Sequence, residues 1–581
     1  MACASATTSS PSAGPSADTR LDALAERYYQ EQLPLNPVAA TANGDSRYND
    51  RFVAGFQPAI RAQYQATVER TSRELDAVPR AALNDKHRIT WDVLHASLGS
   101  ALEASGFPSQ LLPLNQFYSF ASGFAQLGAG NGLHPFRTVK DYEDFLARIG
   151  GFTDVTDVAI ANMRQGIVAG VTTPRVLMER TLPQIEAHVV SDPEKSLFYG
   201  PVRNMPASFS PAERARLTIA YTDAIRDRIV PAYRKLHAFV RDEYIPAART
   251  TSGYGSLPDG AAWYAQLARA STTTNLSPDS IHRLGLSEVT RIQREMIKVK
   301  EQVGFTGSLK DFFAYLGTEA RFRYGSREEM LASYREAKAR IDPLTDKLFD
   351  FRPKADYEIR IVEPFRERSA AGGSYQTASP DGSRPGIFFL NTYQPNTHTR
   401  FGTEDLLLHE GSPGHHFQLS VQRELTGIPS FRRFGGFTAY SEGWGLYAES
   451  LGRELGVYTD PYQYYGMLAG ELWRAIRLVL DTGIHAKGWT REQAIAYARD
   501  NSSNSPESIE SEVERFMAIP GQALAYKMGQ LKITELRRRA EAQLGPTFDI
   551  RKFHRAILEN GPLPLDVLET RINEWIAAQK S

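Results

Sequence analysis

The sequence predicts a mainly α-helical protein, and two observations carry that prediction. Apolar residues recur at spacings of three and four, the pattern of amphipathic helices, along several long segments. These segments are residues 21–33, 59–78, 140–170, 211–248, 279–303 and 326–351. Only two short segments, residues 357–362 and 386–391, have the β-branched and aromatic composition of strands. At 581 residues, the chain is long enough for one large helical body.

Residues 1–20 differ in composition from the rest of the chain. Ala, Ser, Thr and Pro predominate, and such a segment buries too little apolar surface to order itself, so we expect a disordered tether. Cys3 is the only cysteine, which excludes an intrachain disulfide and a cysteine-based metal site. A lone cysteine before such a tether resembles the mature start of a bacterial lipoprotein. We therefore expect a lipid anchor at Cys3 and a periplasmic or membrane-tethered location, with an ordinary disordered N-terminus as the alternative.

The rest of the chain is expected to divide near residue 350. Residues 21–350 form a helical half, one wall of a cleft, in which Ser277 caps the helix that follows it. Residues 351–581 form the catalytic half, and here the two strand segments are predicted to pair as a small antiparallel hairpin, with turn residues at 379–386. The segment 372–376 is interpreted as a loop.

Charge and hydropathy exclude several classes of partner. Lys plus Arg and Asp plus Glu both number 67, so nothing electrostatic favours nucleic acid or an anionic membrane. No apolar stretch reaches about 18 residues, so no segment should cross a bilayer. The chain lacks the G-x-S-x-G pattern of a serine hydrolase. We therefore expect partners that are small or neutral.

The stretch LLLHEGSPGHHFQ, residues 406–418, carries the strongest chemical signal. A catalytic zinc needs protein ligands such as histidine and a nearby carboxylate to act as base, which H-E-x-x-H supplies on one helical turn. Here Pro413 stands where the second histidine would be, and it should kink or break the helix. Gly414 then permits a bulge that returns His415 to the ligand position. His416 is the alternative ligand.

A third ligand is expected on the helix predicted at residues 440–455. It carries Glu442 and Glu449, which lie two turns apart on one face. The Glu-Gly-aromatic context of Glu442 resembles the pattern that carries the glutamate ligand of gluzincin metallopeptidases. Glu449 is then expected to orient a histidine or to be a surface charge.

Four motifs in order identify a resemblance to a known family. They are HEGSPGHHFQ, SEGWGLYAESLGRELGVY, RLVLDTGIHAKGWTREQAIAY and ERFMAIPGQALAYKMG. They resemble the bacterial family named domain of unknown function 885, whose hallmark is H-E-x-x-P-G-H, and the similarity runs from about Leu284 to Gly529. The family is similar to gluzincin-type zinc carboxypeptidases and dipeptidases with a helical, clam-shaped body. The resemblance implies one Zn²⁺ per chain, held by His409, His415 and Glu442, with Glu410 as the base.

Further residues are candidates for the rest of an active site. His485 and Tyr526 match positions at which related zinc peptidases carry donors to the oxyanion, although helix packing explains each equally well. Arg477 and Arg515 are candidates for binding a substrate carboxylate or are structural ion-pair partners. His398, in the loop before the metal helix, is expected to line the cleft or to be an ordinary exposed histidine.

Together these features predict a zinc-dependent metallohydrolase, a peptidase of the carboxypeptidase or dipeptidase type. It is expected to cleave amide bonds of short peptides through a zinc-activated water that Glu410 deprotonates. Two alternatives stand beside this hypothesis. One is a zinc hydrolase of a non-peptide amide, and the other is a non-catalytic periplasmic protein that binds peptides.

Overall fold

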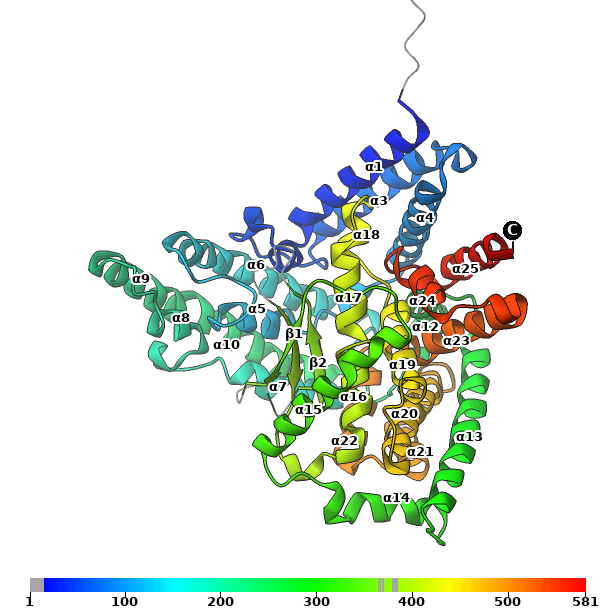
Figure 1. Ribbon diagram of the computed structural model, residues 1–581. Coiled ribbons are helices and arrows are strands. Elements are labelled where there is room, and N and C mark those ends of the chain that lie inside the picture. The colour runs from blue at the N-terminus through cyan, green and yellow to red at the C-terminus, as the bar shows by residue number, and fades with distance from the viewer. Residues whose placement is uncertain (1–14, 364–366, 368–369, 379–384, 581) are drawn as a thin grey trace, which may run out of the picture.

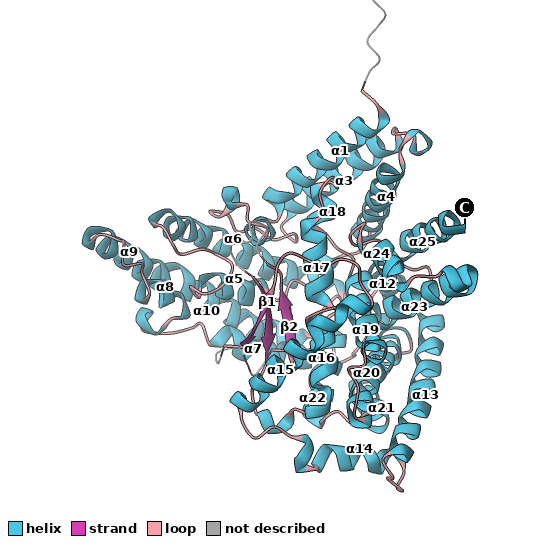
Figure 2. Ribbon diagram, in the orientation of Figure 1, coloured by secondary structure: helices cyan, strands magenta, loops and turns pink. Residues whose placement is uncertain are grey.

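A computed structural model of the chain describes residues 15–363, 367, 370–378 and 385–580. Helices dominate these residues, and one small sheet lies among them (Figures 1 and 2). The mainly α-helical prediction is therefore confirmed. No helix in the described ranges combines the length and the apolarity that a membrane span needs. Cys3 lies outside these ranges.

The helices follow one another with short 3₁₀ and π-helical turns between them. Up to residue 272 they are α1 (Ala17–Gln32), α2 (Pro37–Ala42), α3 (Pro58–Asp76), α4 (Asp85–Ser105), α5 (Phe120–Gly128), α6 (Val139–Ala169), α7 (Arg175–Glu186), α8 (Gly200–Arg203), α9 (Pro211–Ala224), α10 (Val230–Phe239), α11 (Ile245–Ala247) and α12 (Gly260–Thr272). Helix α1 thus begins inside the range 1–20 that we expected to be a tether. Its first turn is stabilised because the Ser16 hydroxyl accepts a hydrogen bond from the Thr19 N–H.

The second set of helices runs to the end of the described chain. They are α13 (Pro278–Gln302), α14 (Leu309–Thr318), α15 (Arg327–Ile341), α16 (Thr403–Glu410), α17 (His415–Glu424), α18 (Ser430–Phe434), α19 (Thr438–Leu455), α20 (Pro461–Ala486), α21 (Arg491–Asn501), α22 (Pro506–Ala518), α23 (Ala525–Leu544), α24 (Ile550–Leu558) and α25 (Leu565–Lys580). Ser277 caps α13 as predicted, since its hydroxyl accepts from the Ser280 N–H.

The hydrophobic cores do not follow the division expected near residue 350. One core is confined to the helices between residues 52 and 248, where the rings of Phe124 and Phe152 stack. Another core joins α13, at Ile292, to α20, at Ile476, and α13 lies along α20 on the right of Figure 1. The segment from α13 onward therefore shares a core with the C-terminal half.

The sheet corrects the predicted hairpin. Strand β1 (Tyr357–Ile361) pairs in parallel with β3 (Gly386–Leu390), and β2 (Gly373–Gln376) pairs with β3 in antiparallel fashion. The strand order β1-β3-β2 makes β3 central. Strand β2 lies in the segment 372–376 that we interpreted as a loop, and it begins with Gly, which has low strand propensity. The predicted turn falls largely on residues outside the described ranges. The sheet contacts α15, α16 and α17 (Figure 1).

Helices α19 and α23 pack closely because glycines face each other. Gly443 on α19 meets Gly529 on α23, and a Cβ atom added to either glycine would overlap the opposite backbone. Larger residues would push the helices apart. This contact fixes α19, which carries Glu442, against α23, which carries Tyr526.

We expect Gly443→Ala to lower the free energy of unfolding by about 1–3 kcal/mol, since the added methyl group overlaps backbone that cannot rotate away. Gly99→Ala is the matched control: Gly99 lies at an exposed position of helix α4 with open space around it. Alanine there should stabilise the helix by up to about 1 kcal/mol. Urea unfolding followed by circular dichroism measures both, and equal effects of the two changes would contradict the packing argument.

Candidate metal centre

A break between two helices places the histidines of the H-E motif. Helix α16 ends at Glu410 and α17 begins at His415, so the helix is interrupted rather than bulged. Gly414 lies directly against the last turn of α16, since a Cβ atom there would overlap the carbonyl oxygens of Leu408 and His409. The indole N–H of Trp444, on α19, donates to the carbonyl of Pro413 at 2.8 Å. The break is therefore held by contacts on both sides.

Three of the predicted ligands converge at this break. The side chains of His409, His415 and Glu442 each offer one ligand atom, and these atoms lie within 4.8 Å of one another. Nε2 of His415 lies 3.3 Å from Oε2 of Glu442, and Nε2 of His409 lies 3.5 Å from the same oxygen. The three ligand atoms therefore lie around one point, and His409, His415 and Glu442 together form the candidate metal cluster, called the metal cluster hereafter.

These distances fit a shared metal ion. They exceed the 2.9–3.0 Å typical of a direct N–H···O hydrogen bond. Two ligand atoms on a tetrahedral zinc, each with a bond of about 2.0–2.1 Å, lie about 3.3 Å apart. Nitrogen and carboxylate oxygen are donors that zinc prefers. The donor set of this site thus suits a zinc ion in both chemistry and spacing.

Glu410 lies beside this cluster as a buried carboxylate. The residue is 7% exposed, and its Oε2 has no hydrogen-bond partner among the described residues. Burial raises the pKa of Glu410, and the charges of His415 and His409 lower it only in part. A carboxylate with an unpaired oxygen and a raised pKa is suited to accept a proton.

Contacts within the cluster shift the pKa values of His409 and Glu442 in opposite directions. Burial lowers the pKa of His409, but its contacts with Glu442 and Glu449 outweigh burial and raise that pKa well above its usual value. Burial raises the pKa of Glu442, yet His415 and His409 hold it well below the usual range. A metal cation at this point would displace the proton that these contacts favour on His409.

Glu449 orients His409, one of the two roles expected for it, and two residues that the sequence analysis did not single out, Arg474 and Asp405, lie beside it. The Nδ1–H of His409 donates to Oε1 of fully buried Glu449 at 2.7 Å, which makes Glu449 the orienting partner. Arg474 on α20 lies 3.5 Å from the same oxygen. Asp405 is buried nearby, and burial together with the Glu449 charge raises its pKa well above the usual range. Asp405 lies four residues before His409 on α16, a spacing that could have revealed it.

The other histidines considered as site residues, His416, His485 and His398, do not belong to the group of His409, His415 and Glu442. Nδ1 of His416 is 2.9 Å from the Tyr375 hydroxyl, and burial lowers the pKa of His416 to about 4. His485 is fully buried: its Nε2–H donates to the Phe516 carbonyl, and its Nδ1 accepts from the Tyr254 N–H. Both nitrogens are thus occupied, so the oxyanion role that we predicted for His485 is wrong.

His398 binds its own loop rather than the cluster. Its Nε2–H donates to the Tyr393 carbonyl at 3.1 Å. The contacts of His398 in the part of the chain that the structure describes do not reach the metal cluster. A role in lining the site is therefore not supported for this residue.

The remaining candidate residues, Arg477, Arg515 and Tyr526, lie in the neighbourhood of Arg474. Arg477 follows it by one turn of α20, and its guanidinium lies 4.7 Å from the centre of the Tyr526 ring. Arg515 lies on α22 and donates to Oε1 of Glu512 at 3.1 Å. Tyr526 adds to the electrostatic environment of both Arg474 and Arg515. The structure therefore brings Arg477, Arg515 and Tyr526 together.

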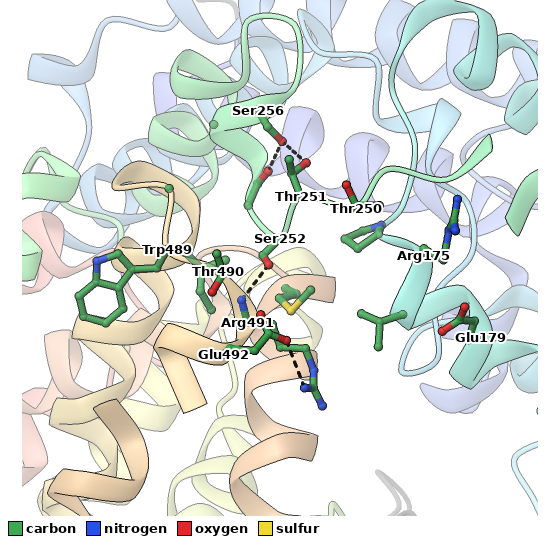
Figure 3. Close-up of a pocket in the computed structure, with 17 residues that line it drawn as sticks. Arg175, Glu179, Thr250, Thr251, Ser252, Ser256, Trp489, Thr490, Arg491 and Glu492 are labelled. Carbon is green, nitrogen blue, oxygen red and sulfur yellow. Dashed lines mark hydrogen bonds and ion pairs between the residues drawn. The ribbon is translucent and has the colours of Figure 1, made fainter. Parts of the chain in front are cut away.

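A separate cavity of about 500 Å³ lies between α7, the loop after residue 249 and the start of α21 (Figure 3). Its polar groups bind one another: the Ser252 hydroxyl accepts from the Arg491 N–H at 3.0 Å, and the Thr251 and Ser256 hydroxyls are 2.7 Å apart. None of the predicted site residues lines it. The cavity is distinct from the metal cluster.

Comparison with known proteins identifies relatives whose function is not established. The model of a family described as "Bacterial protein of unknown function (DUF885)" matches residues 37–572. No curated protein matches the chain.

Two solved structures are similar to the chain. One is described as a "putative lipoprotein" from Colwellia psychrerythraea, with a TM-score of 0.90 and 28% identity, and the match covers 97% of this chain and 100% of that one. The other is described as a "putative lipoprotein of unknown function" from Shewanella oneidensis, with a TM-score of 0.74 and 19% identity, covering 95% and 99% of the two chains. The second likeness shows the shared fold alone.

We expect the wild-type protein, purified without chelator, to hold about one zinc ion per chain. His415→Ala should lose the metal because it removes a converging nitrogen, whereas His416→Ala should retain it because His416 binds Tyr375 instead. Inductively coupled plasma mass spectrometry measures the metal content. Loss of zinc from the His416 variant with retention in the His415 variant would reverse the assignment.

The two glutamates of α19 should differ in their effect on metal binding. Glu442→Ala removes a ligand and should abolish zinc retention after dialysis. Glu449→Ala removes only the acceptor that orients His409, so zinc affinity should fall by about 10- to 100-fold. Competition with a fluorescent zinc chelator measures both affinities, and a zinc-loaded Glu442 variant would make Glu449 the ligand.

Proposed function

We propose that this chain, which belongs to the DUF885 family of bacterial proteins of unknown function, is a zinc-dependent hydrolase that cleaves amide bonds in short peptides. One observation carries the proposal. The ligand atoms of His409, His415 and Glu442 converge at the spacing of a shared zinc, and the unpaired carboxylate of Glu410 is buried beside them. A protein that only binds peptides has no use for a base next to a metal site.

The side chains have separate roles in this proposal. Zinc bound to the three ligands would lower the pKa of a water molecule and polarise an amide carbonyl. Glu410 accepts the proton of the attacking water on its carboxylate and passes it to the leaving amine. Tyr526, whose hydroxyl accepts from the Gln522 amide at 3.4 Å and also contacts Arg515, donates a hydrogen bond to the carbonyl oxygen as negative charge develops there.

Export and tethering form the second part of the proposal. The relative from Colwellia psychrerythraea is described as a "putative lipoprotein" and matches the chain along 97% of its length. The chain has a single cysteine, Cys3, within a segment rich in Ser, Thr and Ala. We infer that Cys3 carries a lipid anchor and that the helical body works in the periplasm.

We expect Glu410→Gln to reduce peptide hydrolysis by about 10²- to 10⁴-fold while zinc stays bound, because the amide cannot accept the proton of water. Glu404→Gln is the matched control, since Glu404 lies on the same helix and pairs with Arg340. Hydrolysis of a mixed peptide library, followed by mass spectrometry, gives the rates.

Near-wild-type turnover in the Glu410 variant would remove Glu410 from the mechanism. A zinc-loaded wild-type protein that leaves every peptide of the library intact would contradict the proposed peptidase activity.

A further inference from the structure

Arg477 has hydrogen-bonding capacity that the described residues do not use. The residue is 8% exposed, and its Nη2 donates to Oε2 of Glu512 at 2.7 Å. Its Nε and Nη1 are buried without a partner among the described residues. Buried polar groups are almost always hydrogen-bonded, so these donors indicate an acceptor that comes from outside the chain.

The charges around Arg477 indicate that this acceptor is an anion. Glu512 is shared, since Nη1 of Arg515 donates to its Oε1 at 3.1 Å. Burial raises the pKa of Glu512, but the two arginines outweigh burial and hold that pKa at about 2. One carboxylate thus faces two guanidinium groups, and an excess positive charge remains in a largely buried place. An anionic ligand would balance it.

Neighbouring side chains hold the two arginines in position. The Tyr526 ring lies under the Arg477 guanidinium at 4.7 Å, which restricts its plane. Nη2 of Arg515 donates to the Gln522 side chain at 2.8 Å. Planar guanidinium groups fixed in this way match the two oxygens of a carboxylate. The set Arg477, Arg515 and Tyr526 is called the arginine subsite below.

The arginine subsite lies close to the metal cluster. Arg474 contacts Glu449, which accepts a hydrogen bond from the ligand His409. Arg477 follows Arg474 by three residues of α20, a rise of about 4.5 Å along the helix. A peptide residue spans about 3.3–3.6 Å. The spacing of these two arginines along α20 is thus comparable to one or two residues of an extended peptide.

We propose that the arginine subsite binds the free α-carboxylate of a peptide, so that the enzyme acts on residues at the C-terminal end of its substrates. This assignment rests on the proposed peptide hydrolysis, and it names the substrate class: short peptides with an unblocked C-terminus. A C-terminal amide has the same shape without the charge, and it forms no ion pair with the two arginines.

The test compares a library of tripeptides with free C-termini against the same sequences as C-terminal amides. Mass spectrometry follows their consumption by the zinc-loaded protein. We expect the free acids to be consumed at least about tenfold faster, the effect of losing a charge-assisted hydrogen bond. Arg477→Met should bring this ratio close to one, and Arg477→Lys should restore it only in part because lysine lacks the fork.

Arg491→Met is the matched control, because Arg491 also pairs with a buried glutamate, Glu514, but lines the separate cavity. It should keep the wild-type ratio of acid to amide consumption. Equal consumption of acids and amides by the wild type would overturn the arginine subsite, as would an Arg477→Met protein that keeps the full preference.

A binding measurement separates this inference from the proposed hydrolysis. Native mass spectrometry of the Glu410→Gln protein with the same library shows which peptides are retained. If the wild type hydrolyses nothing but acids are retained over amides, the hydrolysis proposal fails and the arginine subsite stands. Retention of both classes equally, or of neither, overturns the arginine subsite.

Discussion

The metal cluster depends on the close approach of Gly414 to the carbonyl oxygens of Leu408 and His409. Only a residue without a Cβ atom fits there, and its position sets where α17 starts relative to the end of α16. On one continuous helix, His415 would point about 120° away from His409. The interruption removes that separation, and both imidazoles meet Glu442 of α19. The Pro413–Gly414 pair thus replaces the regular spacing of a helical zinc motif.

Local signals in the sequence predicted much of this architecture, and non-local pairing explains the main error. Helices follow from periodic apolar residues, and the convergence of His409 and His415 follows from a helix-breaking pair between them. The partner of a strand is not encoded in its own residues. Strand β3 pairs with β1 in parallel, and the short strand β2, which comes between them in the chain, pairs with the other edge of β3 in antiparallel fashion. Its four residues, Gly373–Gln376, carried no clear strand signal.

The same distinction between local and non-local signals applies to the candidate site residues, of which His409, His415 and Glu442 converge while His485 lies apart. Residue type and helical spacing indicated which groups have suitable chemistry, but they did not show which partners those groups already have. His485 is bound on both ring nitrogens by backbone groups of other segments. Glu449 and Glu442 share a face of α19, and only the three-dimensional structure shows that the first contacts Nδ1 of His409 and the second approaches its Nε2.

Arg474 lies between a region with excess carboxyl groups and a region with excess guanidinium groups. These two regions favour ligand groups of opposite charge. Around the metal cluster, carboxyl groups outnumber the guanidinium group of Arg474: those of Asp405, Glu410 and Glu449 are buried, and that of Glu442 is half-buried. Burying unpaired negative charge is costly, so this side favours a cation. One helical turn away, Arg477 and Arg515 share a single carboxylate, so that side favours an anion. Under the proposed function, a peptide would satisfy both sides in one orientation, with its carbonyl oxygen at the cation and its terminal carboxylate at the arginines. The two imbalances would then select the end of the peptide as well as the bond.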